Sequence, residues 1–218
     1  MHCLLVASTP MEINPFTDHL STTEKLNHID FDVDILITGV GSNAATYGLT
    51  RYLQHKRPDL VIQAGVAGAF DDSIKLGSVF AIRQDALADQ GVQEKNGFLD
   101  VFDMKLALAN EIPYKKGVLP NPYTELIKRT RLKKANGITV NEVTTSKKRA
   151  AHYVSRYKAD LESMEGASLH YVCIMEHISF LQVRAVSNYV GERNKKKWNI
   201  PLAINNLNKE LIRLLESL

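Results

Sequence analysis

Short apolar runs alternate along the chain with longer segments in which apolar residues recur every three or four positions. Five of these runs are rich in Val, Ile, Leu and Phe and predict β-strands: Leu4–Ala7, Asp34–Thr38, Leu60–Ala64, Val79–Ile82 and Phe180–Val186. Strands that alternate with helical segments are typical of domains in which helices cover a sheet. The pattern therefore predicts a layered α/β fold.

Two segments carry clear helical signals. The first runs from Ser42 to Gln54, and the Ser42 hydroxyl is a plausible N-cap. The second lies near the C-terminus, where Pro201 suits the first turn because it has no N–H to leave unpaired. Four leucines at i, i+4, i+7 and i+8 form the apolar face of this second helix: Leu207, Leu211, Leu214 and Leu215.

The pattern is irregular between residues 84 and 116, where Gly91, Gly97 and Pro113 interrupt it. We expect this segment to form an excursion over the edge of the sheet rather than a second domain. The rest of the chain contains no internal repeat and no low-complexity tract. Residues 1–218 are therefore predicted to form a single domain, which is long enough to bury a sizeable core.

The composition fits a globular protein, with 44% hydrophobic and 23% charged residues. The formal net charge is +3, and the densest basic runs, 147–149 and 195–197, are short enough to be solvated surface. No apolar run approaches the roughly 18 residues that a membrane span needs. We therefore expect neither nucleic acid nor a membrane as a partner.

The chain has two cysteines, Cys3 and Cys173, and each lies in an apolar run. They do not form a CxxC motif, and the seven histidines show no cluster with metal-ligand spacing. Buried free thiols are typical of proteins from reducing compartments. The first residues also lack the basic region and the apolar run of a signal peptide. These features predict a cytoplasmic protein without a bound metal.

Two glycine-rich turns follow predicted strands. The first, Gly39–Ala44, is followed by Asp59 and matches the G-x-G-x-x-G/A fingerprint of dinucleotide-binding folds, although Asp59 precedes a strand instead of ending one. A simpler interpretation is that these glycines let a helix pack closely against the sheet. The second turn, Gly65–Ala69, is either a tight strand exit or a backbone wall that a sugar or a base approaches closely.

Five motifs, in order along the chain, resemble those of the nucleoside phosphorylase and nucleosidase family. They are Pro10–Glu12, Thr38–Gly41, Ala64–Gly68, Asp160–Ala167 and Val183–Asn188. The resemblance extends from Leu4 to Leu215, which is nearly the whole chain. It implies a three-layer α/β/α sandwich around a central mixed sheet, a small-molecule nucleoside as substrate, no cofactor, and a homo-oligomer (a dimer or larger).

The resemblance also assigns roles to residues within these motifs. Family members break a purine–ribose bond while positive charge develops near C1′ of the sugar. Glu12 is then the general base that deprotonates water, and Glu165 accepts hydrogen bonds from the ribose hydroxyls. Met164 lies against the sugar, and Gly65 and Val66 belong to the backbone wall. From the residues alone, both glutamates are also explained as acids at helix starts, and Met164 as a core residue.

Asn188 stands where most adenine-cleaving members of the family carry Asp. The Asn amide cannot supply a proton, but its NH₂ group donates toward N7 and O6 of a 6-oxopurine. This position therefore favours hypoxanthine over adenine, and leaves open how the departing base is protonated. Gln63 stands where phosphorolytic relatives place a phosphate-binding Arg, so water is the expected nucleophile.

Within the family, the sequence is most similar to the futalosine hydrolases. The features are Asn188, the pair Ala88–Gly91 and Gly97–Asp100, and the run Ser187–Asn194 that leads to Trp198. That branch hydrolyses futalosine, an inosine-like nucleoside with an aromatic keto-acid arm, to hypoxanthine and dehypoxanthine futalosine in menaquinone biosynthesis. Arg193 and Lys195 are candidate partners for the carboxylate of the arm.

Three alternatives remain open. Within enzymes, the chain is a methylthioadenosine/adenosylhomocysteine nucleosidase or another purine nucleosidase or phosphorylase. A second class is a nucleoside-binding relative without catalysis, although Glu12 and Glu165 are both retained. The third is a dinucleotide-dependent oxidoreductase, which rests on the Gly39–Ala44 fingerprint alone.

Overall fold

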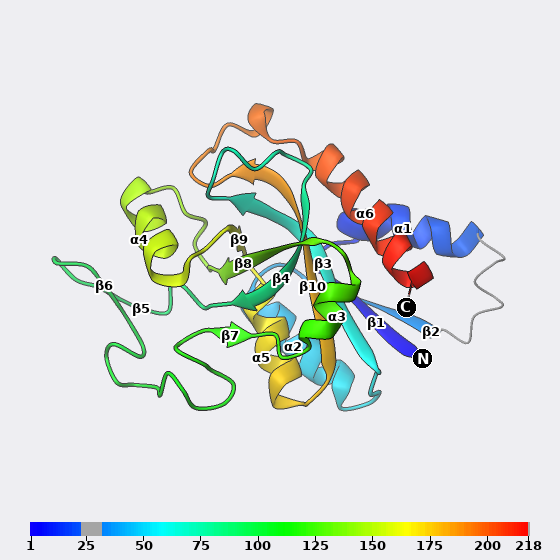
Figure 1. The fold of residues 1–218 in the computed structure, drawn as a ribbon, viewed down its shortest axis with the longest axis horizontal. Coiled ribbons are helices and arrows are strands. Elements are labelled where there is room, and N and C mark those ends of the chain that lie inside the picture. Colours follow the sequence, from blue (N-terminus) through cyan, green and yellow to red (C-terminus); the bar gives the residue numbers. More distant parts are fainter. Residues whose placement is uncertain (23–31, 218) are drawn as a thin grey trace.

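The computed structural model describes residues 1–22 and 32–217, and Figure 1 shows its fold. The strands are β1 His2–Ala7, β2 Asp32–Ile37, β3 Leu60–Ala69, β4 Val79–Asp85, β5 Gly91–Gln93, β6 Phe98–Asp100, β7 Leu119–Pro120, β8 Lys133–Thr139, β9 Leu161–Ser163 and β10 Ser179–Tyr189. The helices are α1 Pro10–Thr22, α2 Ser42–Leu53, α3 Thr124–Arg129, α4 Lys147–Tyr157, α5 Gly166–Met175 and α6 Ile200–Ser217, with a short 3₁₀ helix η2 Lys195–Lys197. Within the described residues, no helix has the length and apolar character needed to cross a membrane.

The described strands other than β5 and β6 form a mixed sheet. Strands β2, β1, β3 and β10 lie side by side and are all parallel. Beyond β10 the sheet continues through β4, which is antiparallel to β10, and then through β8 and β9, which are parallel to their predecessors. Strand β9 pairs in turn with the end of β3, so this half of the sheet closes on itself.

Helices cover both faces of the open part of the sheet (Figure 1). Alternate residues of a strand point to opposite faces, and β1 divides accordingly. Cys3, Leu5 and Ala7 pack in one core with residues of α1 and α6, whereas Leu4 and Val6 pack in another with residues of α2 and α5. The predicted three-layer α/β/α sandwich around a mixed sheet is therefore confirmed.

Each of the five apolar runs predicted as strands lies in a strand, except that β2 ends at Ile37, one residue before the predicted Thr38; β3 and β10 extend well beyond the predicted runs. The C-terminal helix is also confirmed, with Pro201 in its first turn and its four leucines buried. The N-cap prediction is wrong: the cap of α2 is Gly41, and Ser42 is the first helical residue. Its hydroxyl donates to the Met164 carbonyl at 3.2 Å and accepts no capping hydrogen bond from a backbone N–H of α2.

Residues 84–116 contain the end of β4, the β5–β6 hairpin and a series of turns. The hairpin forms a separate two-stranded sheet and lies beside α4 at one end of the molecule (Figure 1). Cys3 and Cys173 are both free and buried, as predicted.

Candidate active site

A cavity of about 290 Å³ opens at the carboxyl ends of β1, β3 and β10. In open α/β sheets this edge is the usual position of a ligand site. Most of the predicted site residues line the cavity: Glu12, Val66, Met164, Glu165 and Asn188. Its remaining lining residues are Ser8, Thr9, Met11, Val40, Ala67, Gly68, Val143, Glu162, Ser163, Ser187, Arg193, Trp198, Ile200 and Ile204.

Glu12 lies in the first turn of α1, yet its side chain is only 7% exposed. One carboxylate oxygen, Oε2, accepts hydrogen bonds from the backbone N–H of Thr9 at 3.0 Å and from the Thr9 hydroxyl at 3.2 Å. The other, Oε1, accepts from the backbone N–H of Val66 at 3.1 Å. These bonds hold the carboxylate in one orientation at the cavity wall. An exposed helix-start acid, the simpler interpretation of Glu12, would not be buried in this way.

Gly65 does not line the cavity but lies directly behind it. A Cβ atom at Gly65 would stand 2.8 Å from Glu12 Oε1 and 2.3 Å from Arg184 Nη1. The missing side chain thus leaves the space in which Glu12 and Arg184 converge. Val66 contributes its backbone N–H to Glu12, while its side chain packs against the core shared with α1 and α6.

Arg184 is a buried cation that the sequence motifs contained but that we did not predict as a site residue. Its side chain is 1% exposed and lies on β10, whose other residues are all uncharged. Its Nη2 donates to Gln63 Oε1 at 2.8 Å, and its Nη1 lies 3.7 Å from Glu165 Oε2. A charged residue within an apolar strand run was the sequence signal for this position. We call Glu12, Glu165 and Arg184 the cavity cluster.

Glu165 is the N-cap residue of α5 and is 5% exposed. Its Oε1 accepts a hydrogen bond from the backbone N–H of Gly41 at 3.0 Å. Gly39 and Gly41 both have positive φ values, 88° and 98°, which glycine adopts without strain. The first glycine turn therefore presents a backbone donor to the Glu165 carboxylate.

The same geometry argues against dinucleotide binding at the Gly39–Ala44 turn. The Gly41 N–H, which a bound pyrophosphate would need, already donates to Glu165. Asp59 lies before β3, at the opposite edge of the sheet, where its carboxylate accepts from the backbone N–H of His2 at 2.8 Å. Asp59 is therefore not placed to bind a ribose at the glycine turn.

Asn188 reaches the cavity through an irregularity in β10. The register between β10 and β3 shifts between Val186 and Asn188, so Ser187 is an extra residue in the strand. Such a bulge redirects the side chains near it, and both Ser187 and Asn188 line the cavity. Asn188 Oδ1 accepts from the Ser187 hydroxyl at 2.8 Å, and Nδ2 donates one hydrogen to the Tyr189 carbonyl at 3.2 Å. The amide group has a second N–H hydrogen for a ligand.

Another carboxylate, Glu162 on β9, lines the cavity and is 7% exposed. Its Oε1 accepts from the backbone N–H of Thr144 at 3.0 Å, whereas Oε2 has no hydrogen-bond partner within the described residues. Burial raises the pKa of Glu162, and the adjacent backbone N–H and hydroxyl of Thr144 oppose this shift. Glu162 lies within the Asp160–Ala167 motif, but the motif does not assign it a role.

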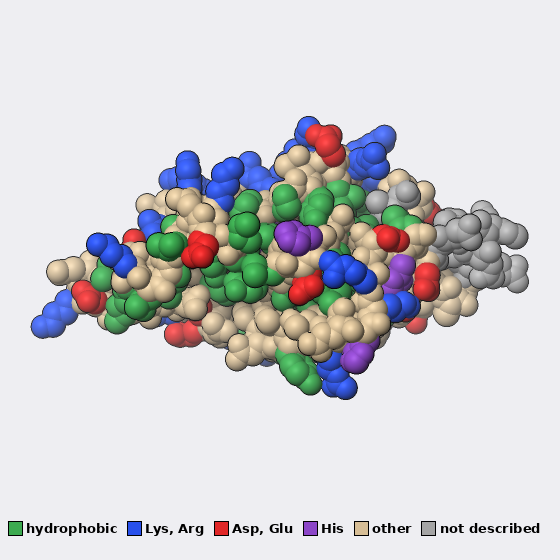
Figure 2. Space-filling model, turned by 90° about the horizontal axis from the view of Figure 1, so that it is seen from below, with side chains coloured by type: hydrophobic (Ala, Val, Ile, Leu, Met, Phe, Trp, Pro, Cys, Tyr) green, Lys and Arg blue, Asp and Glu red, His purple; other side chains and the backbone are tan. Residues whose placement is uncertain are grey.

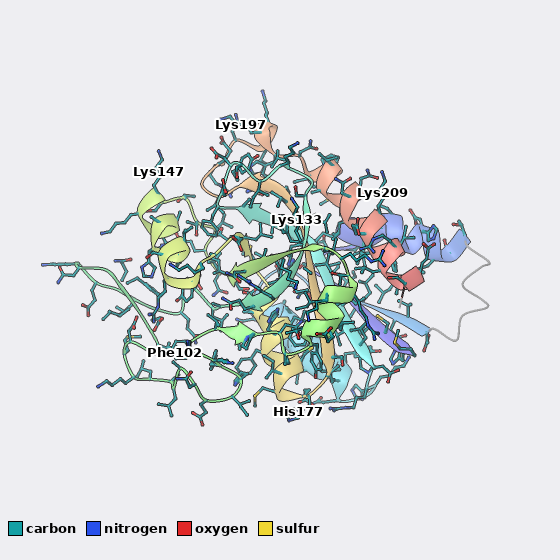
Figure 3. The ribbon with its side chains drawn as sticks, in the orientation of Figure 1. Phe102, Lys133, Lys147, His177, Lys197 and Lys209 are labelled. Atoms are coloured by element: carbon teal, nitrogen blue, oxygen red, sulfur yellow. The ribbon has the colours of Figure 1, made fainter. Side chains whose placement is uncertain are left out.

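The outer part of the cavity is mainly apolar and contains Met164, half-buried, together with residues of α6 and the segment before it. The Arg193 guanidinium lies over the Trp198 ring, 5.5 Å from its centroid, and both residues line the cavity. The neighbouring lysines face solvent: Lys197, like Lys147 on α4, projects from the outer edge of the molecule (Figure 3).

Behind the cavity cluster lies a second set of buried polar side chains, which we call the rear cluster: Asp85, Thr139, His170 and Gln182. Asp85 accepts from the Thr139 hydroxyl at 2.8 Å and from Gln182 Nε2 at 3.1 Å. Burial raises the pKa of Asp85 to about 6, against the effect of these hydrogen bonds. Burial lowers the pKa of His170 to about 4, and the Leu119 carbonyl accepts a hydrogen bond from its Nδ1.

At the other edge of the sheet, His2, Asp32 and Asp34 place ligand atoms within 4.8 Å of one another. The sequence spacing does not indicate this group, because β1 and β2 bring it together. The Lys56 ammonium lies 2.7 Å from Asp34 and 3.4 Å from Asp32, and lowers the pKa of Asp34 to about 2. A lysine therefore supplies the positive charge at this position.

Comparison with known proteins places this geometry in a family. The chain is 30% identical to a futalosine hydrolase of Thermus thermophilus over 181 residues, which cover 83% of this chain and 80% of the relative. It is 30% identical to a futalosine hydrolase of Streptomyces coelicolor, covering 78% and 73% of the two chains. It is also 28% identical to a 5′-methylthioadenosine/S-adenosylhomocysteine nucleosidase of Haemophilus influenzae, covering 72% and 68%.

Solved structures show the same fold. The futalosine hydrolase of Helicobacter pylori superposes with a TM-score of 0.77 at 18% identity, covering all of this chain and 98% of the other. A 5′-methylthioadenosine/S-adenosylhomocysteine nucleosidase of the same organism gives a TM-score of 0.79, also at 18% identity, with coverage of 100% and 99%. A family model described as the phosphorylase superfamily matches residues 32–217. Because this match spans most of the chain, the protein belongs to the phosphorylase superfamily.

Proposed function

We propose that this N-glycosyl hydrolase cleaves the N-ribosidic bond of futalosine, releasing hypoxanthine and dehypoxanthine futalosine in menaquinone biosynthesis. The observation that carries the proposal is the convergence of two buried carboxylates, Glu12 and Glu165, in the cavity that Asn188 also lines. The identity of 30% to two futalosine hydrolases supports the choice of substrate.

Glu12 acts as the general base. A water molecule attacks C1′ of the ribose, and Glu12 accepts one of its protons as the O–C1′ bond forms. The electron pair of the bond between C1′ and the purine nitrogen leaves with the base. The backbone N–H groups of Thr9 and Val66 fix the orientation of the carboxylate, which reduces the reorganisation that the step requires.

Glu165 binds the sugar. Its carboxylate accepts hydrogen bonds from the ribose hydroxyls and lies close to the positive charge that develops at C1′. Met164, the preceding residue, packs against the sugar ring. Because Gly41 and Arg184 both contact Glu165, the carboxylate keeps its position before the substrate arrives.

Asn188 holds the leaving base. Its free Nδ2 hydrogen donates toward N7 or O6 of hypoxanthine and stabilises the negative charge that the base takes with it. Ser187 accounts for one lone pair of the Asn188 carbonyl oxygen, which fixes the amide with its NH₂ group available for donation.

Water is the nucleophile in this proposal because the cavity offers phosphate little positive charge. Gln63 is buried and accepts from Arg184, whose guanidinium also pairs with Glu165. Arg193 is the only lysine or arginine that lines the cavity within the described residues. Since it lies at the exposed end, we assign it to the carboxylate of the futalosine arm.

We also propose a cytoplasmic homo-oligomer, a dimer or larger. Large apolar side chains are exposed on the turns after β6 and on helices α2 and α5: Tyr47, Leu106, Leu108, Ile112, Tyr171 and Met175. Figure 2 shows hydrophobic side chains gathered on one face of the molecule. Burial of such a face in a subunit interface removes apolar surface from water. The two buried free thiols agree with a reducing compartment.

The test is chromatographic detection of the released base, in phosphate-free buffer, with futalosine, inosine and methylthioadenosine offered separately. We expect hypoxanthine from futalosine and no adenine from methylthioadenosine. In Asn188→Asp, the carboxyl group can donate to N7 and accept from a 6-amino group. We therefore expect its preference for adenine over hypoxanthine substrates to rise about 100-fold, given 1–3 kcal/mol for each altered hydrogen bond.

Other results assign other functions. Adenine released by the wild-type protein would make it a methylthioadenosine/S-adenosylhomocysteine nucleosidase, the activity named for the Haemophilus influenzae relative. Base release only after phosphate is added would make it a phosphorylase. No release from any substrate would favour a nucleoside-binding protein.

A further inference from the structure

Asp89 lies shortly after the end of β4 and is half-buried. It belongs to the Ala88–Gly91 motif, to which the proposed mechanism gives no role. The pairing of β4 with β8 continues past the end of β4, because Leu87 forms a parallel bridge with Thr139 and the Ala88 N–H donates to the Thr139 carbonyl at 3.0 Å. This pairing brings Asp89 beside the residues that follow β8.

The Asp89 carboxylate holds two consecutive residues of that segment. Its Oδ2 accepts from the backbone N–H of Asn141 at 2.6 Å and from that of Glu142 at 3.1 Å. Its Oδ1 accepts from the side-chain amide of Asn141 at 3.2 Å. Hydrogen bonds to an ionised acceptor are stronger than those between neutral groups. One carboxylate, 52 positions away in sequence, therefore fixes the direction in which the chain leaves β8.

The same segment is tied to the protein on its other side. The backbone N–H of Thr144 donates to Glu162 Oε1 on β9 at 3.0 Å. Between the two attachments lies Val143, whose side chain lines the cavity and is 37% exposed. An apolar side chain at a cavity wall gains free energy when a ligand covers it. The position of this wall residue is thus set by a carboxylate that does not itself line the cavity.

We propose that Asp89 is a positioning residue of the active site: by holding Asn141 and Glu142, it places Val143 against the bound nucleoside and so sets how tightly the substrate binds. The inference rests on the proposed function, because it takes the ligand of the cavity to be a nucleoside. It gives the acid of the Ala88–Gly91 motif a physical role at the site.

The first test is Asp89→Ala, which removes all three hydrogen bonds to the segment. We expect KM for futalosine to rise about tenfold, because burial of the two outer carbons of a valine contributes roughly this factor to affinity. We expect kcat to stay within about twofold, since loss of a contact made equally in the ground state and the transition state raises KM alone. Glu12 and Glu165 lie outside this segment, on α1 and at the start of α5.

The conservative variant Asp89→Asn should rescue binding. Its amide oxygen can take the place of Oδ2 and accept from both backbone N–H groups. The side-chain amide of Asn141 can turn and present its oxygen to the new NH₂ group. We therefore expect KM to lie within about threefold of the wild-type value, the cost of losing the charge on the acceptor.

A double-variant cycle distinguishes positioning from general stability. Val143→Ala alone should raise KM about tenfold. Because Asp89 acts through Val143, adding Asp89→Ala should raise KM little further, to well below the roughly hundredfold expected of independent effects. A carboxylate that only stabilised the fold would lower the thermal unfolding midpoint in both backgrounds without this coupling in KM.

The matched control is Asp71→Ala. Asp71 is exposed and does not line the cavity, and its Oδ1 accepts from the backbone N–H of Ser73 at 2.8 Å. It therefore also holds a turn by a backbone N–H, and we expect its loss to leave KM unchanged. Asp89→Ser, which has a shorter side chain with a single acceptor oxygen, replaces Asp89→Ala if that variant fails to fold. We expect its KM to rise at least about threefold.

The inference is overturned if the KM of Asp89→Ala is unchanged, if Asp89→Asn is impaired as much as Asp89→Ala, if the effects at Asp89 and Val143 simply multiply, or if Asp71→Ala raises KM equally. The same measurements with inosine and methylthioadenosine separate this failure from that of the proposed function. Dependence on Asp89 with one of these nucleosides, without cleavage of futalosine, would retain the inference and reject the substrate. Cleavage of futalosine without this dependence would do the reverse. If no nucleoside is cleaved, their dissociation constants, measured by calorimetry, replace KM.

Discussion

The cavity cluster and the rear cluster both contain buried carboxylates, and they lie on either side of the start of α5. In the cavity cluster, Glu12 and Glu165 accept from the backbone N–H groups of Thr9, Val66 and Gly41, and they line the cavity. In the rear cluster, Asp85 accepts from two buried side chains, Thr139 and Gln182, and from the backbone N–H of Ala86, and it does not line the cavity. Contact with the cavity therefore distinguishes the carboxylates that we propose to act chemically from the one that supports the fold.

The two clusters are joined through three consecutive residues. Glu165 belongs to the cavity cluster, Gly166 leaves room for Asp85 and Gln182, and the backbone N–H of Ala167 donates to the Thr139 hydroxyl at 2.7 Å. The rear cluster therefore fixes the helix start that carries Glu165, the carboxylate that we propose to bind the sugar. Changes in the cavity cluster should affect catalysis, and changes in the rear cluster should first affect stability.

The largest expected effect is on catalysis, from Glu12→Gln. Glutamine keeps the size of the side chain, but its single oxygen can accept from the N–H of Thr9 or of Val66 and not from both, and it cannot take a proton from water. We expect kcat/KM for futalosine to fall about 10³-fold, as is typical for loss of a general base. The midpoint of thermal unfolding should change by only a few degrees. Steady-state kinetics and calorimetry check both expectations.

An exposed glutamate provides the control for this variant. Glu125 lies on α3 and pairs with Lys128 at the surface, so Glu125→Gln should keep wild-type activity. If Glu12→Gln retained more than a tenth of the activity, Glu12 would not be the base. The cavity cluster would then have no demonstrated role in catalysis to set it apart from the rear cluster.

The fold was predictable where apolar residues were continuous. β1, β3 and β10 are buried on both faces and read as apolar runs. β8 escaped prediction because it begins with two lysines and contains Asn136 and Gly137. Gly137 is required there, since a Cβ atom would stand 2.6 Å from Asp85 Oδ2. The polar residues of this strand serve long-range packing that no local pattern shows.

The candidate site was predictable where a motif contains the residue itself. It was not predictable where two hydrogen-bond partners come from distant segments of the chain. Glu12, Glu165 and Asn188 were each part of a motif. Gln63 and Arg184 form one hydrogen bond across 121 positions of the chain, and only the pairing of β3 with β10 brings them together. The unpartnered oxygen of Glu162 is likewise a property of the folded protein alone.

The second expected effect is on stability, from Gly166→Ala. The new Cβ would stand 2.1 Å from Gln182 Nε2 and 2.2 Å from Asp85 Oδ2, so the rear cluster must shift. We expect the free energy of unfolding to fall by about 3 kcal/mol, the upper range for an overpacked core. Denaturant unfolding, followed by circular dichroism, measures the change.

A second substitution sharpens this test. Gln182→Ala removes one of the two side chains that the new methyl group would meet. The double variant Gly166→Ala with Gln182→Ala should therefore be less destabilised than the sum of the single variants. Strict additivity would mean that the cost of Gly166→Ala arises elsewhere, and the rear cluster would not be what confines this glycine.

The smallest expected effect is a dependence of stability on pH that originates in His170. Its pKa is about 4 in the folded protein, below its usual value of 6.5, because the buried imidazole is kept neutral. The stability that it contributes is present above pH 6.5 and is lost as the pH falls toward 4. Between pH 7 and pH 5 this loss is about 2 kcal/mol. Asp85 acts in the opposite sense, because its raised pKa removes stability as the pH rises from about 4 to about 6.

His170→Asn separates the two contributions. The Asn amide can still donate to the Leu119 carbonyl but has no titration in this range, whereas Asp85 is present in both proteins. We therefore expect the variant to be less stable at pH 7, with a loss between pH 7 and pH 5 that is about 2 kcal/mol smaller than in the wild-type protein. Denaturant unfolding at both pH values gives the difference. Equal losses in the two proteins would show that His170 takes up its proton without a cost in stability. The rear cluster would then be accessible to water, although only the cavity cluster is expected to be.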